Sequence, residues 1–120
     1  MKYHQLDIDN QESIDTFAKF IQTTYNGLDI LVNNAAIAFK AADTTPFSIQ
    51  AIETIRVNFT GTLNVCKALF PLLRPHARVV NVSSHVGMLK IVKDESVRNR
   101  LKSPNLTISE LVDIMNTFVK

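Results

Sequence analysis

The 120-residue sequence predicts an α/β fold whose strands run parallel. Apolar, strand-like segments alternate with helical patterns along the chain, which is the order that βαβ units produce. The segment Leu28–Val32 is apolar on both faces apart from Asp29, as a parallel strand covered by helices should be. A hydrophobic content of 46% with 20% charged residues is typical of a globular protein, and the length fits one domain.

The first part of the chain is expected to form a strand, a helix and a second strand. Tyr3–Ile8 reads as a short strand that ends at the Asp9-Asn10 pair. The helix that follows has apolar residues at helical spacing and stops at Asn26-Gly27. Its apolar positions are Ile14, Phe17, Ala18, Ile21 and Tyr25. Leu28–Val32 is the second strand.

A long helix, a third strand and two shorter helices are expected from Pro46 onward. Pro46 suits the first turn of a helix, and the amphipathic pattern continues to Leu73, where nearby prolines mark its end. Arg78–Val82 is the third strand. Beyond residue 87, a helix at about residues 92–101 precedes a capping-box pattern from Thr107 to Glu110. One apolar face follows, formed by Leu111, Ile114, Met115 and Phe118.

Composition and residue spacing argue against several classes of function. The net charge is +2, and the basic run Lys90–Lys102 lacks aromatic stacking residues, so it indicates a solvated helix face rather than a nucleic-acid site. No apolar stretch reaches the roughly 18 residues of a membrane span, and no membrane partner is expected. The single cysteine, Cys66, excludes an internal disulfide, and the three histidines lack metal-ligand spacing. We therefore expect a cytoplasmic protein without a metal site.

The stretch Val79–Ser84 carries the strongest chemical signal. It is an apolar strand that delivers a serine hydroxyl at its carboxyl end, where α/β sheets bind ligands. No G-x-S-x-G turn surrounds Ser84, and its neighbour His85 is poorly placed as a base. A hydroxyl that polarises a carbonyl by hydrogen bonding needs no adjacent base. Ser84 therefore fits this role better than that of a nucleophile.

Two further segments combine residue types that regular structure does not favour. Asn33-Asn34-Ala35-Ala36 ends the second strand with two amides, which can hold neighbouring backbone groups, and two small residues that let a ligand approach. Asn58 and Gly61 lie within the long helical pattern, where each costs about 0.5–1 kcal/mol relative to alanine. This cost indicates a kink, close packing or a functional backbone carbonyl. A packing choice that is merely tolerated is the alternative.

These motifs together resemble the short-chain dehydrogenase/reductase family, in particular the central part of its animal NADPH-dependent carbonyl reductases. The resemblance is carried by five segments: residues 4–8, residues 27–40, Pro46-Phe47, Val57–Thr62 and Arg78–Ser84. It implies a partial Rossmann-like doubly wound parallel sheet over residues 1–87 that lacks the first two strands and the C-terminal strands. It also implies that residues 88–120 are a helical insertion.

The resemblance implies a role for each matching residue. Asp7 would accept a hydrogen bond from the adenine amino group of NADPH, and Ile8 would pack beside the ring. The adenosine-ribose side of the cofactor cleft would be lined by Asn34, Ala35 and Ala36. Ala36 stands where the family usually has glycine. Catalysis would use the main-chain carbonyl of Asn58, holding a water of the proton relay, and the Ser84 hydroxyl on the substrate carbonyl. Substrate or glutathione would meet Phe39, Lys40 and Gln50.

Two motifs of the family are not found in these 120 residues. One is the glycine-rich T-G-x-x-x-G-x-G turn that cradles the pyrophosphate, and the other is the catalytic Tyr-x-x-x-Lys pair. We therefore expect an incomplete carbonyl reductase that is inactive alone. Its full-length relative would be a monomer that reduces small ketones, aldehydes and quinones. The alternative is a non-catalytic form that acts as a binding or regulatory partner.

Overall fold

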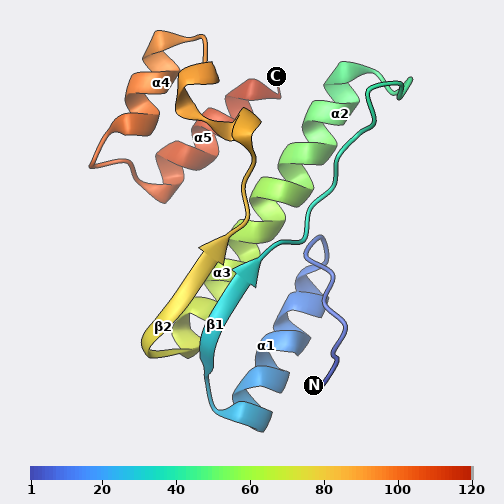
Figure 1. Ribbon diagram of the computed structural model, residues 1–120, viewed down its shortest axis with the longest axis vertical. Coiled ribbons are helices and arrows are strands. Elements are labelled where there is room, and N and C mark those ends of the chain that lie inside the picture. The colour runs from blue at the N-terminus through green and yellow to red at the C-terminus, as the bar shows by residue number, and fades with distance from the viewer. Residues whose placement is uncertain (120) are drawn as a thin grey trace. The chain divides into compact units, whose positions relative to one another are not determined.

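A computed structural model describes residues 1–119 and confirms a mixed α/β fold with a small parallel sheet (Figure 1). The chain divides into two compact units, Met1–Val82 and a second that begins at Ser83. The first unit holds the helices α1, α2 and α3 and the strands β1 and β2, and the second holds α4 and α5. Each unit is described by itself below.

The helix α1, Gln11–Tyr25, confirms the predicted second element. It begins at Asn10, whose side-chain oxygen accepts a hydrogen bond from the Ser13 amide at 3.0 Å. It ends at Asn26, which has a left-handed backbone with φ of 53° and is followed by Gly27 with φ of 139°. α1 packs against α3, and the amphipathic pattern is confirmed for Ile14 and Ile21, which are buried, whereas Tyr25 at the end of the helix is exposed.

The sheet consists of two parallel strands, β1 (Leu28–Asn33) and β2 (Leu73–Asn81). β2 begins five residues before the predicted start, and the register shifts between Leu28 and Ile30, so that Asp29 faces four residues of β2. The Arg74 side chain lies in this irregular stretch and donates hydrogen bonds to the Asp29 carboxylate and to the Tyr25 carbonyl at the end of α1. The bulge therefore attaches β2 to the α1–β1 turn.

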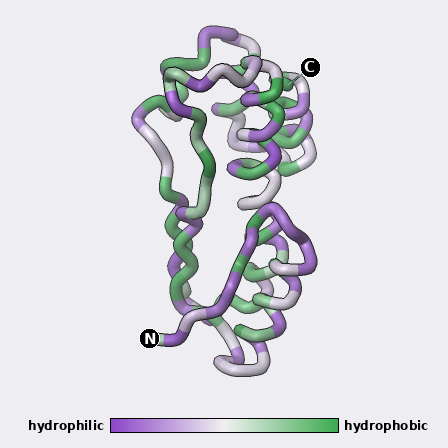
Figure 2. Tube along the Cα trace, turned by 90° about the vertical axis from the view of Figure 1, so that its right-hand side faces the viewer, coloured by the Kyte–Doolittle hydropathy of each residue, from purple (hydrophilic) through white to green (hydrophobic). Residues whose placement is uncertain are grey.

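One face of this sheet packs on helices and the other is exposed, so the predicted cover of Leu28–Val32 on both faces is wrong for the described chain. Leu31 points to the helices and is 8% exposed, whereas its neighbours Ile30 and Val32 are 62% and 53% exposed. Figure 2 shows the helices of this unit on one side of the strand pair. The core consists of Ile14, Leu31, Val65 and Leu69.

The predicted long helix is present, but three helical forms share its length. α2 (Phe47–Thr54) passes into a π-helix over Ile55–Gly61, which passes into α3 (Thr62–Leu69) and a final 3-10 turn. Pro46 is the N-cap rather than a residue of the first turn, a small correction to the prediction. A π-helix is rare and often marks a functional segment. Asn58 and Gly61, two residues that an ordinary helix disfavours, both lie in this π-helix.

The strand predicted at Tyr3–Ile8 is wrong. Within residues 1–119 the sheet contains only β1 and β2, and residues 1–7 have no regular secondary structure. An extended segment becomes a strand only where a neighbouring strand supplies ladder hydrogen bonds. The apolar residues Leu6 and Ile8 of this segment are instead partly buried by packing against the core.

In the second unit, two short 3-10 turns lead to α4 (Glu95–Lys102) and α5 (Ile108–Phe118). α4 begins later than predicted because the Asp94 side chain accepts a hydrogen bond from the Val97 amide at 3.0 Å and caps the helix there. The predicted capping box of α5 is confirmed: the Glu110 amide donates to the Thr107 hydroxyl, and the Glu110 carboxylate accepts from the Thr107 amide. Among the described residues, no helix is long and apolar enough to cross a membrane.

Candidate functional site

The carboxyl ends of β1 and β2 lie at the same edge of the sheet, because the strands are parallel. The Val82 amide donates to the Asn33 carbonyl at 2.9 Å, which extends the pairing just past β2. The Asn33 side-chain amide donates to Asn81 Oδ1 at 2.8 Å and to Cys66 Sγ at 3.4 Å. The sequence predicted that this amide would hold backbone groups. Its observed partners are side chains, and they tie both strand ends to α3.

Asn58 joins the π-helix to the loop that follows β1. Its Oδ1 accepts from the Ile37 amide at 2.8 Å, and its Nδ2 donates to the Ile37 carbonyl at 2.8 Å. This reciprocal pair reproduces the two bonds that facing residues of antiparallel strands exchange. Both polar atoms of the side chain therefore help to position the loop.

Gly61 sets the distance between the π-helix and the N-terminal segment. The residue is buried, and a Cβ atom at this position would lie 2.7 Å from the Ile8 carbonyl oxygen. Side chains do not approach a carbonyl oxygen so closely, so only glycine permits this contact. Of the explanations that the sequence left open for Gly61, close packing is the one that this geometry supports.

Asp7 lies in a turn that several hydrogen bonds hold in one conformation. Its Oδ1 accepts from the Asp9 amide at 3.0 Å, its own amide donates to Ser13 Oγ at 2.9 Å, and its carbonyl accepts from the Asn10 amide at 3.2 Å. The second carboxyl oxygen accepts no hydrogen bond from any described residue. Asp7 thus keeps an exposed acceptor oxygen free, and the adenine contact that the family resemblance implies for it stays a prediction.

The structure brings three of the residues predicted to bind cofactor around one cavity. Ile8, Asn34 and Ala35 line a space of about 60 Å³, whereas Asp7 and Ala36 do not. This volume is far below the roughly 300 Å³ at which ligand pockets begin. The cavity is therefore too small to be a complete ligand-binding site by itself.

Of the residues predicted to meet substrate, Phe39 and Lys40 lie in the loop between β1 and α2, and Gln50 lies within α2. Lys40 is exposed and its carbonyl accepts from the Asp43 amide at 2.9 Å. The Gln50 side chain donates to the Thr45 carbonyl at 2.7 Å and so holds the end of the loop to α2. Hydrogen bonds from Thr45 lower the pKa of Asp43. Phe39 is half-buried, and no hydrogen bond or aromatic contact joins it to Lys40 or Gln50 in the described chain.

Ser84 lies in the second unit, three residues beyond the end of β2. It is exposed and extended, and it is the N-cap of the short turn His85–Gly87. Its Oγ accepts from the Val86 amide at 3.3 Å. This bond uses an oxygen lone pair and leaves the hydroxyl proton available as a donor. The hydroxyl can therefore still donate a hydrogen bond to another group, and its predicted role toward a substrate carbonyl stays a prediction.

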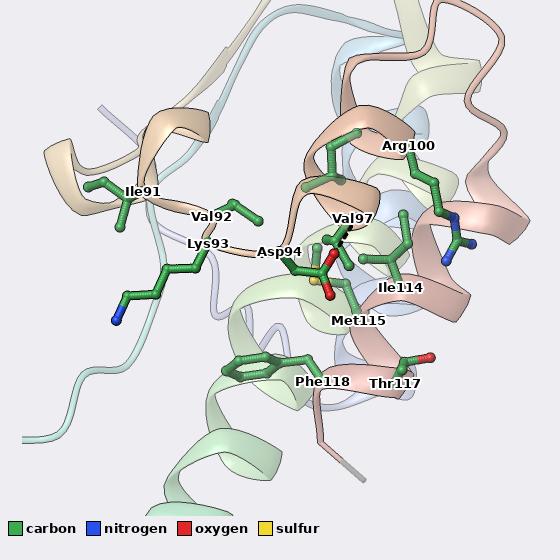
Figure 3. A pocket seen from close by; sticks show the side chains of 11 residues that line it. Ile91, Val92, Lys93, Asp94, Val97, Arg100, Ile114, Met115, Thr117 and Phe118 are labelled. Atoms are coloured by element: carbon green, nitrogen blue, oxygen red, sulfur yellow. Dashed lines mark hydrogen bonds between the residues drawn. The ribbon is translucent and has the colours of Figure 1, made fainter.

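The second unit also contains a larger apolar hollow of about 500 Å³ (Figure 3). It lies between α4, α5 and the turn before α4, and none of the predicted site residues lines it. Its apolar lining consists of Ile91, Val92, Val97, Leu101, Ile114, Met115 and Phe118. Figure 3 shows the Asp94 carboxylate bonded to Val97, so this polar group at the rim is already occupied in capping α4.

Sequence reasoning missed three residues that support the site. The Ile37 backbone hydrogen-bonds the Asn58 side chain, and the Ser13 hydroxyl accepts from the Asp7 amide. Arg56 donates to the carboxylates of Asp9 and Glu53. The Arg56–Glu53 pair could have been found, since residues three apart face each other on a helix. The other contacts join positions distant in sequence or use backbone atoms, which leave no pattern in the residue types.

Comparison with known proteins decides the family. The family model described as short chain dehydrogenase matches residues 1–94. The chain belongs to the short-chain dehydrogenase family. Carbonyl reductase (NADPH) 1 of Bos taurus is 50% identical over 119 residues, which cover 98% of this chain and 43% of that protein. The mouse enzyme of the same name is 51% identical over 121 residues, covering 99% of this chain and 43% of its own length.

Solved structures agree with the family and with the predicted fold class. Menthone neomenthol reductase from Mentha piperita matches with a TM-score of 0.82 and 26% identity, over 97% of this chain and 53% of that one. Salutaridine reductase from Papaver somniferum matches with a TM-score of 0.82 and 29% identity, over 97% of this chain and 51% of that one. This member of the short-chain dehydrogenase family spans about half the length of these reductases.

Proposed function

We propose that this chain is the central part of an NADPH-dependent carbonyl reductase, in which Ser84 stabilises the negative charge that develops on the substrate oxygen. The observation that carries the proposal is about 50% identity to curated carbonyl reductases over nearly the whole chain. The Ser84 hydroxyl supports it, because its lone pair is used by Val86 while its proton is free to be donated. Donors aimed at a developing oxyanion are a major source of rate enhancement.

The cofactor assignment extends the same proposal. A bound NADPH would supply the hydride. The adenosine end would meet the free acceptor of Asp7, the side chain of Ile8, and the strand end at Asn34, Ala35 and Ala36. The cavity that Ile8, Asn34 and Ala35 share supports this grouping.

The π-helix supports a separate role for Asn58 in handling a proton. Its side chain holds the Ile37 backbone through Oδ1 and Nδ2, and its main-chain carbonyl would hold a water of the relay. Phe39, Lys40 and Gln50 would face a small ketone, aldehyde or quinone, or a glutathione conjugate. We expect the full-length protein to be a monomer and the 120-residue chain alone to be inactive.

A chimaeric enzyme tests the proposal. The matching segment of the bovine carbonyl reductase is replaced by this chain, and NADPH oxidation is followed with a quinone substrate. We expect turnover in the chimaera and a loss of about 10²–10³ in kcat for Ser84→Ala, the cost of removing one oxyanion donor. Ser83→Ala is the matched control, since it removes the adjacent hydroxyl. A Ser84→Ala chimaera as active as its parent would overturn the assignment.

A further inference from the structure

One π-helix holds both segments that carry the proposed adenosine-side residues. Its Asn58 binds the loop after β1 through Ile37, and its Gly61 lies against the Ile8 carbonyl. A third contact comes from Arg56, whose Nη1 donates to Asp9 Oδ2. The Ile55–Gly61 segment therefore reaches two parts of the chain that lie far apart in sequence.

Arg56 is suited to hold the Asp9 end of this arrangement in one orientation. While Nη1 bonds Asp9, Nη2 donates to Glu53 Oε2, three residues earlier on the same helix. A planar guanidinium can satisfy two carboxylates at fixed angles, which the single ammonium of a lysine cannot do. The hydrogen bonds to Glu53 and Asp9 raise the pKa of Arg56, so the group stays charged at any physiological pH. Glu53 thus orients the arginine that holds Asp9.

The contact reaches Asp7 through one further hydrogen bond. The Asp9 amide donates to Asp7 Oδ1 at 3.0 Å, so the backbone that Arg56 restrains also orients the Asp7 carboxylate. The remaining Asp7 contacts lead to Asn10 and Ser13 at the start of α1. Arg56 is therefore the link in this network that connects the Asp7 turn to the π-helix through a side chain.

We propose that Arg56 is a positioning residue for the adenosine end of the cofactor, which it serves by fixing the Asp7–Asp9 turn against the π-helix. The proposal rests on the proposed function, because it requires that Asp7 meets an adenine. It assigns no chemistry to Arg56 itself. Its consequence is that loss of Arg56 should loosen one turn selectively, without loosening the core.

Amide hydrogen exchange on the 120-residue chain tests the proposal. Exchange of the Asp9 amide is measured relative to the Val65 amide in the core. We expect Arg56→Gln to raise this ratio about two- to fivefold, the range for an exposed ion pair, and Arg56→Lys to have a smaller effect. The matched control is Arg74→Gln, which removes another arginine–carboxylate pair of the same unit and should leave the ratio unchanged.

Adding NADPH gives the readout that a purely structural role would not move. We expect millimolar NADPH to shift the Asp7 and Asp9 amide resonances of the unsubstituted chain. The shift should be at least twofold smaller in Arg56→Gln, and Arg56→Lys should recover part of it. An unchanged exchange ratio in Arg56→Gln, or an unprotected Asp9 amide in the unsubstituted chain, overturns the proposal. If Arg56→Gln speeds exchange but the chain does not respond to NADPH, the Arg56–Asp9 pair is only structural and the cofactor role is overturned. The Ser84→Ala chimaera tests the reductase assignment separately.

Discussion

Replacement of Gly61 by alanine sets two known effects against each other. In a helix interior, alanine is more stable than glycine by about 1 kcal/mol. Here, however, the new Cβ would lie 2.7 Å from the Ile8 carbonyl oxygen and 3.3 Å from the Ile8 carbonyl carbon. Because the neighbour is backbone, no side-chain rotation relieves the contact, and the N-terminal segment must move by about 0.7 Å to restore an ordinary separation of 3.4 Å. Overpacking of this kind costs about 1–3 kcal/mol.

The sum is an expected net loss of about 1 kcal/mol in the free energy of unfolding for Gly61→Ala. Urea unfolding followed by far-ultraviolet circular dichroism measures it, and Thr60→Ala is the matched control because Thr60 is exposed on the same π-helix. The control should be neutral or slightly stabilising. If Gly61→Ala instead stabilises the chain by about 1 kcal/mol, propensity alone governs the site and the close approach of Ile8 does not exist in solution.

Three other outcomes follow from the contacts described. Asn58→Leu should release the loop after β1, seen as at least a tenfold faster amide exchange at Ile37, while α1 keeps its protection. The pKa of Glu110 is lowered from 4.5 by its hydrogen bonds with Thr107. The stabilisation that ionised Glu110 gives α5 is therefore complete at neutral pH and is lost as the pH falls through the lowered pKa. Circular dichroism as a function of pH should show this loss of helix content, and the Glu110→Gln variant should not show it. The exposed sheet face presents Ile30 and Val32 to solvent, and we expect this apolar face to make the 120-residue chain self-associate. Val32→Lys should then reduce self-association in sedimentation velocity without changing helix content, and an unaltered association constant would contradict this expectation.

The features that the sequence predicted correctly are those with a local cause. The capping box from Thr107 to Glu110 needs only residues three apart, and the stop of α1 at Asn26 needs only a residue that tolerates a left-handed backbone. β1 was recognisable because a short apolar run between turn signals has few other structures available. For the capping box and the end of α1 the partner groups lie within the same stretch of sequence, whereas β1 is marked by its own apolar run although its partner strand, β2, lies far along the chain.

The predictions that failed or fell short depended on partners elsewhere in the chain. Tyr3–Ile8 has the alternation of a strand, but a strand also needs a neighbour, and its apolar residues are satisfied equally well by packing on the core. The Asn33 amide was expected on backbone groups, yet its partners Asn81 and Cys66 meet it only after the sheet has formed. Residue types reveal that a polar group must be satisfied, but the topology decides by which atom.

Asn58 and Gly61 show how a local cost can still point to a distant contact. Both residues lower helix stability, and neither cost has a local compensation in the π-helix itself. Asn58 is compensated by its hydrogen bonds to the Ile37 backbone, and Gly61 by its close contact with the Ile8 carbonyl. Each residue thus lowers helix stability but contacts a segment that is proposed to bind cofactor. An unfavourable residue inside an otherwise regular pattern is thus informative because something outside the pattern must offset it. In this chain the two such residues of the π-helix mark the segments on which the proposed adenosine site depends.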